Sequence, residues 1–405
     1  MGYTTLKQIA SITMGQSPKS EFVTNQQTGL PLLNGPTEFG DYHPYPKQFS
    51  SKYSKMAKSG DLLFCVRGSV GKMNWANQEY AIGRGIAAIA SKNGADFNFF
   101  IKALIEIKLP SLLSIATGST FPNISRGMLE ELSFPVVHET EVKIISSLLS
   151  NIERYVFNLN LQNQVLEKMA QAIFKHWFVD FEFPNEQGKP YKSSGGKMVA
   201  SELGEIPEGW LVVSLLEKSD LLSGGTPKTT NDNYWGGNIP WVSAKDIGRN
   251  QSYTFVTKTE KTITELGLRH SAANLLPKYT TVLVARGSVG KFAVLGTEMC
   301  INQSCYGLFP KKKEDYVLTY FTFKNALDRM QKMVHGTVFD TVTTNTLRDT
   351  LVLSAPDRIR VLLRKTVNPL FEKILINQEQ IQTLTKMRDL LLPKLISGEI
   401  KIKAS

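Results

Sequence analysis

Two long stretches of the chain place apolar residues at steps that alternate between four and three positions. The first runs from Glu139 to about Phe178 without a Gly or a Pro, and the second ends near Leu395. Such steps put the apolar side chains on one narrow stripe of a helix, as in paired long helices. The pattern therefore predicts two long helices, whose stripes contain Ile152, Asn163, Leu166 and Ile173 in the first and Ile374, Asn377, Ile381 and Leu384 in the second.

Each stripe is too narrow to cover a globular core, so each helix needs one long partner. The obvious partner is the other helix, packed antiparallel as a coiled coil. In that arrangement Asn163 and Asn377 are buried and fix the register at some cost in stability. In the alternative arrangement each helix packs on its own globular domain and both Asn side chains are exposed. Pro369 predicts a kink near the start of the second helix, or the beginning of its long straight part.

The remaining sequence alternates between short apolar runs and longer helical patterns. Short apolar runs bounded by turn residues are typical of buried strands. We expect an α+β fold with a twisted, mostly antiparallel sheet. The predicted strands lie in 62–66, 81–91, 281–285 and 299–310, and the predicted helices in 98–116 and 317–334.

The chain contains an internal repeat. The sequence RGSVGK occurs at 67–72 and again at 286–291, 219 positions later. Its neighbours repeat in the same order: Ser17-Pro18-Lys19 corresponds to Thr226-Pro227-Lys228, and GSTFPNIS corresponds to GTVFDTVT. Matched motifs at a nearly constant offset indicate a duplication.

The repeat and the long helices together predict the domain organisation. Between the first helix and the second copy lies a segment rich in Gly, Pro and Ser, which is typical of a linker. We expect the first globular domain at 1–137, a central helix at 138–180, a linker at 181–209, the second globular domain at 210–355 and a C-terminal helix at 356–405.

Lys and Arg outnumber Asp and Glu by 47 to 36, which gives a net charge of +11. This excess favours a polyanionic partner without naming it. The three cysteines, Cys65, Cys300 and Cys305, are too few and too scattered for a disulfide framework, so we expect them to be buried apolar residues. The N-terminus has no signal peptide, and no apolar run approaches the ~20 residues that span a bilayer. We expect a soluble cytoplasmic protein.

The repeated RGSVGK does not fit an ATP-binding loop. Such a loop has two glycines five positions apart and a hydroxyl residue after the Lys, whereas Met73 or Phe292 follows here. The better interpretation is a tight turn after a strand, where glycines let the backbone approach a phosphate or a base edge. Arg67 and Arg286 can then bind guanine or phosphate. The alternative is a structural turn with solvated charges.

No motif for catalysis or for metal binding is found. The chain lacks the [ND]PP[YF] pocket of adenine methyltransferases, a nuclease carboxylate cluster and any His spacing typical of metal sites. We therefore expect no catalytic residues and no metal. Two other functions stay open: a fused methyltransferase or nuclease polypeptide, and a scaffold that presents duplicated protein-binding domains without binding DNA.

The chain resembles the specificity (S) subunits of type I restriction–modification systems over its whole length. The repeat order, the RGS-x-GK turns, INQS at 301–304, the linker sequence and LLLPKLISGEI at 390–400 carry the resemblance. The first copy departs from the pattern, because it has IGRG near the place of INQS. The resemblance implies two target recognition domains that contact DNA. Candidate DNA-contacting residues are Arg67, Ser69, Lys72, Arg84, Arg126, Arg286, Ser288, Lys291, Asn302 and Gln303.

The resemblance also implies how the complex is divided. Each recognition domain reads one half of an interrupted site in double-stranded DNA, and the helices set the spacing. A helix of about 39 residues extends ~58 Å, more than one ~34 Å turn of DNA. The helices also dock two methyltransferase (M) subunits, which bring S-adenosylmethionine. Two restriction or translocase (R) subunits can join, bringing ATP and magnesium. The chain itself carries no cofactor.

Overall fold

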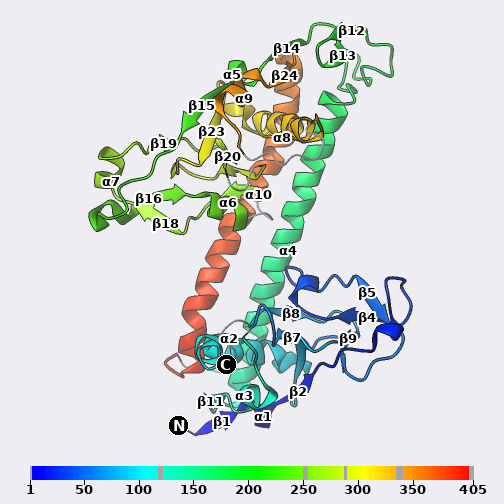
Figure 1. The fold of residues 1–405 in the computed structure, drawn as a ribbon, viewed down its shortest axis with the longest axis vertical. Helices are drawn as coiled ribbons and strands as arrows, with labels where there is room; N and C mark the ends of the chain where they lie inside the picture. Colours follow the sequence, from blue (N-terminus) through cyan, green and yellow to red (C-terminus); the bar gives the residue numbers. More distant parts are fainter. Residues whose placement is uncertain (1, 117–121, 250–253, 287–289, 334–340, 401–405) are drawn as a thin grey trace. The chain divides into compact units, whose positions relative to one another are not determined.

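The computed structural model describes residues 2–116, 122–249, 254–286, 290–333 and 341–400 (Figure 1). The chain divides into two compact units. Unit 1 comprises Met1–Asn158 with Gln382–Ser405, and unit 2 comprises Leu159–Ile381. Both units receive residues from the two long helices, α4 (Glu139–Phe178) and α10 (Asp357–Ile396), each of 40 residues. The predicted domain boundaries differ from this division, because they assign each helix to a single segment.

The globular part of unit 1 contains two main sheets. In the first, β2 (Ala10–Met14), β10 (Ile86–Ser91), β7 (Leu62–Cys65) and β8 (Met73–Trp75) pair in that order and are antiparallel. Helix α2 (Asn98–Ser114) packs on it. The second has the order β3 (Val23–Thr24), β5 (Gln48–Ser50), β4 (Leu30–Leu33), β9 (Tyr80–Ile82) and β6 (Met56–Ala57). The remaining elements are β1 (Tyr3–Thr5), which pairs with β11 (Ser133–Pro135), α1 (Leu6–Ile9) and α3 (Arg126–Glu130).

Unit 2 repeats this plan. Its first sheet has the order β15 (Ser219–Ser223), β23 (Cys305–Pro310), β20 (Thr281–Val284), β21 (Phe292–Leu295) and β17 (Phe255–Val256). Its second has the order β18 (Lys261–Ile263), β16 (Trp235–Val242), β22 (Met299–Ile301) and β19 (Leu275–Leu276). The remaining elements are β14 (Leu211–Ser214), which pairs with β24 (Leu351–Ser354), and the helices α5 (Leu215–Lys218), α6 (Ala244–Arg249), α7 (Glu265–Arg269), α8 (Tyr316–Met333) and α9 (Thr344–Asp349).

The mixed helix and strand content of both units confirms the predicted α+β class. Most strand pairs are antiparallel, as predicted. The pairs β4–β9, β16–β22 and β17–β21 are parallel instead. Each parallel pair joins strands that are distant in the sequence, and a local hydrophobic pattern cannot show such a pairing.

The two long helices lie side by side within unit 2 (Figure 1). Asn377 Nδ2 donates a hydrogen bond to Asn163 Oδ1 at 2.9 Å, and both side chains are buried. Near the start of α10, Arg358 bonds the carbonyl oxygen of Asn185, which follows the end of α4. The helices are therefore antiparallel in unit 2. The alternative with solvent-exposed Asn side chains is wrong.

The other predicted stripe residues of unit 2 also lie at or near this seam. Ile374 and Ile381 are buried, while Leu166 and Ile173 are half-buried. In unit 1, Ile152 and Leu384 are half-buried. There Ile145 of α4 and Leu395 of α10 belong to one hydrophobic cluster. A coiled coil along the whole of both helices stays a prediction.

Pro369 does not end the second helix, which begins at Asp357 and continues through this residue to Ile396. A proline inside a helix removes one backbone hydrogen bond without preventing continuation on either side. Tertiary packing stabilises this part of the helix, since Val367 and Phe371 are fully buried. The adjacent Asn368 side chain donates to the carbonyl oxygen of Glu314 at 2.9 Å.

The segment predicted as a linker, 181–209, is folded. It contains the hairpin of β12 (Met198–Ser201) and β13 (Gly204–Pro207). Phe181 and Phe183 are buried and pack against Trp210 with ring centroids 5.7 and 5.3 Å apart. Its Gly, Pro and Ser content reflects tight turns, and the aromatic residues between them form a small core.

The buried Asn pair generates a stability prediction. Among the residues that the structure describes, Asn163 Nδ2 and Asn377 Oδ1 have no hydrogen-bond partner, so the pair has only part of its bonding capacity satisfied. Replacing Asn163 by Ala removes the closer acceptor of Asn377 Nδ2 and leaves it only Gln162 Oε1, at 3.4 Å. We expect a loss of about 1–3 kcal/mol in the free energy of unfolding, measured by urea denaturation.

The control for this prediction is the double variant Asn163→Leu, Asn377→Leu. Two apolar side chains at one seam position leave no polar group unpaired, so the double variant should regain the stability that the single variant loses. Equal stability of Asn163→Ala and the unaltered chain would contradict the role of this pair.

Candidate nucleic-acid interface

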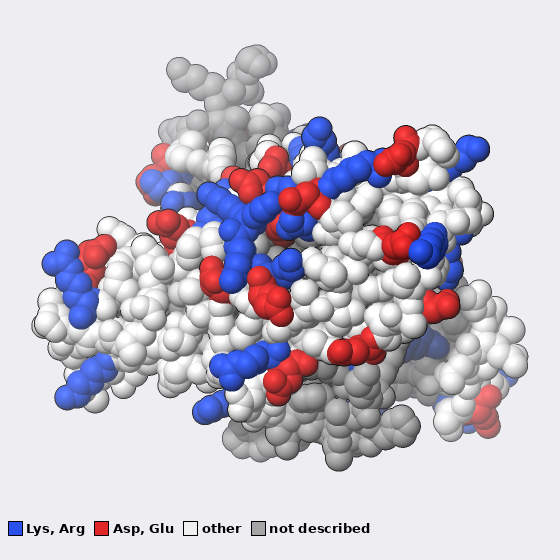
Figure 2. Space-filling view, turned by 90° about the horizontal axis from the view of Figure 1, so that it is seen from above, with Lys and Arg blue, Asp and Glu red and all other residues white. Residues whose placement is uncertain are grey.

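The basic excess of the chain does not by itself locate an interface. On the face shown in Figure 2, Lys and Arg side chains are interspersed with Asp and Glu. On that face, therefore, the basic side chains alone do not mark an interface. The loops that carry the RGSVGK, IGRG and INQS sequences locate a candidate interface more closely.

The RGSVGK segment of unit 1 is a tight turn that leaves β7. Cys65 N donates to the carbonyl oxygen of Lys72 at 2.8 Å, and Gly71 N donates to that of Cys65 at 3.0 Å. Gly68 and Gly71 have φ angles of +75° and +89°, a region that glycine adopts without strain. The closed turn leaves the side chains of Arg67, Ser69 and Lys72 exposed.

Unit 2 closes its copy of the turn in the same way. Val284 N donates to the carbonyl oxygen of Lys291 at 2.9 Å, and Gly290 has a φ of +95°. Arg286 is exposed and Lys291 is half-buried. Ser288 lies outside the described residues.

The arginine of each turn pairs with a second segment. Arg67 forms a β-bridge with Asn123, and its Nε donates to Asn123 Oδ1 at 3.0 Å. Arg286 forms the corresponding bridge with Thr341. The adjacent backbones are bonded as well, since Ile124 N donates to Val66 O at 3.0 Å and Val342 N donates to Ala285 O at 2.9 Å. The backbone at both arginines is therefore fixed by a β-bridge and by an adjacent backbone hydrogen bond.

Backbone hydrogen bonds also identify the counterpart of INQS in the first copy. Val66 N donates to the carbonyl oxygen of Gly85, and Ala285 N donates to that of Ser304. Gly83 N donates to Leu33 O at 2.8 Å, as Asn302 N donates to Val242 O at 2.9 Å. The sequence IGRG therefore holds the place of INQS, with Arg84 at the position of Gln303. Only the Ile is shared, so the sequences alone gave no clear match.

The hydroxyl of the repeated Ser/Thr-Pro-Lys segment contacts this loop in both copies. Ser17 Oγ accepts from Arg84 N at 3.3 Å, and Thr226 Oγ1 bonds Gln303 Oε1. Asn302 Oδ1 accepts from Ser304 N at 3.1 Å. The side-chain oxygens of Asn302 and Gln303 are thus used within their own loop.

These contacts bring the predicted residues of each copy to one end of its sheets. We call this end the reading edge, which contains Ser17, Arg67, Arg84 and Asn123 in unit 1 and Thr226, Arg286, Gln303 and Thr341 in unit 2. Arg126 lies in the helix that follows Asn123. Its Nε forms an ion pair with Glu130 Oε1 at 2.8 Å, so this guanidinium is already partnered.

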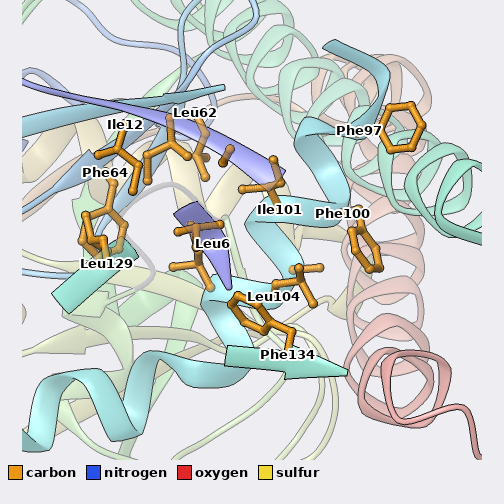
Figure 3. Close-up of a cluster of buried hydrophobic side chains, with 14 of the residues drawn as sticks. Leu6, Ile12, Leu62, Phe64, Phe97, Phe100, Ile101, Leu104, Leu129 and Phe134 are labelled. Atoms are coloured by element: carbon orange, nitrogen blue, oxygen red, sulfur yellow. The ribbon is translucent and has the colours of Figure 1, made fainter. Parts of the chain in front are cut away.

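A hydrophobic core fixes the strands behind the reading edge of unit 1. Leu62 and Phe64 of β7 and Ile12 of β2 belong to the same cluster as Ile101 and Leu104 of α2 (Figure 3). All five are buried. Because the strands are packed on one face in this way, the loops at their ends leave from a rigid base.

All three cysteines are free and buried, as predicted. Burial raises the pKa of the Cys300 thiol to about 11 and that of Cys305 to about 12. Cys65 donates to the carbonyl oxygen of Arg67 at 2.9 Å, beneath the turn. Such thiols stay protonated at neutral pH and act as packing residues.

In unit 1, a half-buried carboxylate attaches the globular part to α4. Glu153 Oε1 accepts from Lys102 Nζ of α2 at 2.7 Å, and Glu153 Oε2 accepts from Trp75 Nε1 of β8 at 3.1 Å. Burial lowers the pKa of Lys102, but Glu153 and Glu106 outweigh it and the net shift is upward. Lys102 therefore stays charged and pairs with both carboxylates.

Unit 2 uses a different carboxylate of the same helix. Glu167 accepts from Tyr320 Oη of α8 at 3.1 Å and from Thr254 Oγ1 at 2.8 Å. Burial, and next the Glu167 carboxylate, raise the pKa of Tyr320 well above its usual value, so the phenol stays a hydrogen-bond donor. Sequence analysis did not single out Glu153 or Glu167, because a carboxylate on a helix is usually solvated.

The residues that the structure describes contain no cluster of three or more His, Cys, Asp or Glu side chains suited to a metal ion. No helix within the described ranges combines the length and apolar character required to span a membrane.

The sequence matches a family model over most of its length. The model is described as the type I restriction modification DNA specificity domain, and it matches residues 1–168 and 207–385. The MjaIX specificity subunit of a type I restriction enzyme from Methanocaldococcus jannaschii is 29% identical over 366 residues, covering 85% of this chain and 78% of that protein. The HindI specificity subunit from Haemophilus influenzae is 22% identical over 415 residues, covering 87% and 89%.

A solved structure has a similar fold. The crystal structure of a type I restriction–modification S subunit from M. genitalium superposes with a TM-score of 0.62. The match covers 99% of this chain and 96% of that one at 16% sequence identity. At this identity the likeness shows the fold alone.

The packing of the IGRG loop generates a prediction about stability. A Cβ atom added at Gly85 would lie 2.4 Å from the carbonyl oxygen of Asn34, a backbone atom that cannot rotate away. We expect Gly85→Ala to lower the free energy of unfolding by about 1–3 kcal/mol, measured by urea denaturation. The matched control is Gly35→Ala in the neighbouring loop, where a Cβ would meet no atom within 4 Å. Equal stability of the two variants would show that the loop is not packed as described.

Proposed function

The chain belongs to the family of type I restriction modification DNA specificity domains, and we propose that each of its two reading edges reads one half of a divided DNA site. The observation that carries the proposal is the duplication of the reading edge. The same backbone hydrogen bonds present Arg67 and Arg84 in one copy and Arg286 and Gln303 in the other. Similar frames with different side chains suit two half-sites of different sequence.

Arginine at the head of each edge supports DNA as the ligand. A guanidinium binds guanine through two parallel hydrogen bonds, or binds a phosphate. Arg67 and Arg286 are exposed, and each is held in a β-bridge. A held backbone reduces the entropy that the side chain loses when it binds.

The long helices are proposed to set the distance between the half-sites and to dock two methyltransferase subunits. Exposed apolar side chains on α4 support the docking role, because a solvated helix face is otherwise polar. Unit 1 exposes Ile144, Leu148 and Tyr155, and unit 2 exposes Leu161, Val165 and Met169.

In the proposed complex the chemistry belongs to partner subunits. The methyltransferase subunits bind S-adenosylmethionine, and restriction or translocase subunits bind ATP and magnesium. This chain contributes recognition and spacing. A fused catalytic polypeptide is disfavoured, since specificity-domain matches occupy both halves of the sequence. A scaffold that does not bind DNA gives no reason for the repeated arginine turns.

The first test of this function removes the arginine of each turn. Arg67→Ala and Arg286→Ala should each weaken binding of site-bearing duplex by the methyltransferase complex about 10- to 100-fold, since one good base contact is worth ~1–3 kcal/mol. Fluorescence anisotropy measures the affinity, and circular dichroism checks that the variants are folded. Lys92→Ala, at the far end of β10, is the control. Unchanged affinity in both single variants and the double variant would remove these turns from the interface.

The second test shortens both helices by one heptad. Deleting 155–161 from α4 and 379–385 from α10 keeps Asn163, Asn377, Glu153 and Glu167. A heptad contributes ~10 Å of helix, so the selected gap should shorten by up to about three base pairs. Selection from duplexes whose half-sites are separated by different gaps measures the change. An unaltered gap would show that the helices do not set the spacing.

A further inference from the structure

Four neighbouring strands of unit 1 bring four loop residues into one row beside the arginine turn. In the sheet order β5–β4–β9–β6, Gln48 pairs with Leu32, Leu33 with Ile82, and Met56 with Ala81. The residues just beyond these pairs are Lys47, Asn34, Arg84 and Lys55, which lie at the same end of adjacent strands. We call them the first strand-end row. All four are exposed.

Unit 2 has the corresponding row in the sheet order β18–β16–β22–β19. Trp241 pairs with Lys261 and with Cys300, and Leu275 also pairs with Cys300. The residues of the second strand-end row lie one to three positions further along these strands, toward the reading edge. They are Glu260, Ser243, Gln303 and Asn274, which correspond in order to Lys47, Asn34, Arg84 and Lys55.

The two rows differ in charge at equivalent positions. The first row has three cations, none of which is among the groups that form ion pairs in the described part of unit 1. The second row has one charge, Glu260, which pairs with Lys245 at 3.1 Å. A loop carboxylate is present in both copies, as Glu38 and Asp246, so it does not account for the difference.

The two rows also differ in how many of their side chains already form hydrogen bonds within the protein. In the second row, Ser243 Oγ donates to Asp246 at 2.6 Å, and Asn274 Nδ2 donates to the carbonyl oxygen of Ser223 at 3.4 Å. Gln303 is bonded to Thr226. In the first row, the side-chain nitrogens of Lys47, Lys55 and Arg84 form no hydrogen bond or ion pair with any described residue. The first row therefore carries three solvated cations, whereas the second row carries no cation.

We infer that the first strand-end row is a phosphate-binding surface, and that unit 1 supplies more of the salt-dependent affinity for DNA than unit 2. This inference rests on the proposed function. Strands lie ~4.8 Å apart, so the row extends ~14 Å, a length over which one DNA strand carries about four phosphates. Lysine binds phosphate as a point charge and does not read the base sequence.

The difference between the rows predicts that the two copies bind DNA in different ways. Cations at the strand ends position one half-site by charge, regardless of its sequence. The second row offers neutral or internally paired groups, so unit 2 depends more on direct contacts with the bases. Removing the charges of Lys47 and Lys55 should thus lower affinity for every sequence and leave the recognised motif unchanged.

The experiment compares two charge-neutralising double variants of unit 1. Lys47→Gln, Lys55→Gln alters the row. Lys7→Gln, Lys92→Gln removes the same charge at the opposite end of the domain, where Lys92 Nζ bonds the carbonyl oxygen of Lys7 at 2.6 Å. The full chain is assembled with a methyltransferase subunit of a type I system. Binding to a labelled mixed-sequence duplex is measured between about 50 and 200 mM salt.

We expect the row variant to lower the slope of log affinity against log salt by about two, since each phosphate contact contributes close to one. The loss of affinity over that salt range should become about 10-fold smaller. The control variant should keep the slope of the unaltered complex. An unchanged slope in the row variant, or an equal fall in both variants, would overturn the inference. Failure of the unaltered complex to bind DNA would instead contradict the proposed function.

Discussion

The structure depends on two carboxylates of one helix that are partnered by groups from different recognition domains. Glu153 accepts hydrogen bonds in unit 1 and Glu167 accepts them in unit 2. Both carboxylates are half-buried, and a carboxylate partly removed from water is costly unless it is partnered, so these contacts favour one position of each globular part on the helix. The two residues are fourteen positions apart, which is two heptads, and they therefore share one heptad position.

At the reading edges, the two copies share one backbone frame and differ in the side chains that it carries. Backbone hydrogen bonds hold the loops of both copies, and these bonds do not depend on which side chain is attached. Gly83-Arg84 and Asn302-Gln303 consequently occupy one frame although they differ in size and charge. A duplicated gene could thus change what each copy contacts without altering the fold beneath it. The difference in charge between the two strand-end rows is a consequence of this freedom.

The sequence predicted what local patterns determine. Apolar steps of four and three located both long helices, and short apolar runs located strands such as β7 and β20. The interruption of the stripe by Asn163 and Asn377 indicated a buried polar pair, because an Asn inside an otherwise apolar seam needs a partner. The cysteines were correctly expected to be buried.

The features that were missed depend on contacts between distant segments. The match of IGRG to INQS follows from hydrogen bonds to other strands, and only one residue is identical. The row formed by Lys47 and Lys55 requires the strand order β5–β4–β9–β6. The folded structure within 181–209 was missed because Gly and Pro also build tight turns, and because its aromatic residues Phe181 and Phe183 pack against Trp210.

The most direct measurement is the map of methylated adenines in a host that gains this chain together with a methyltransferase subunit of a type I system. If two different readers are held at a fixed separation, the host should acquire one new motif made of two unlike half-sites divided by a constant number of unread bases. A continuous motif, a variable gap, or methylation that is the same without this chain would contradict the account.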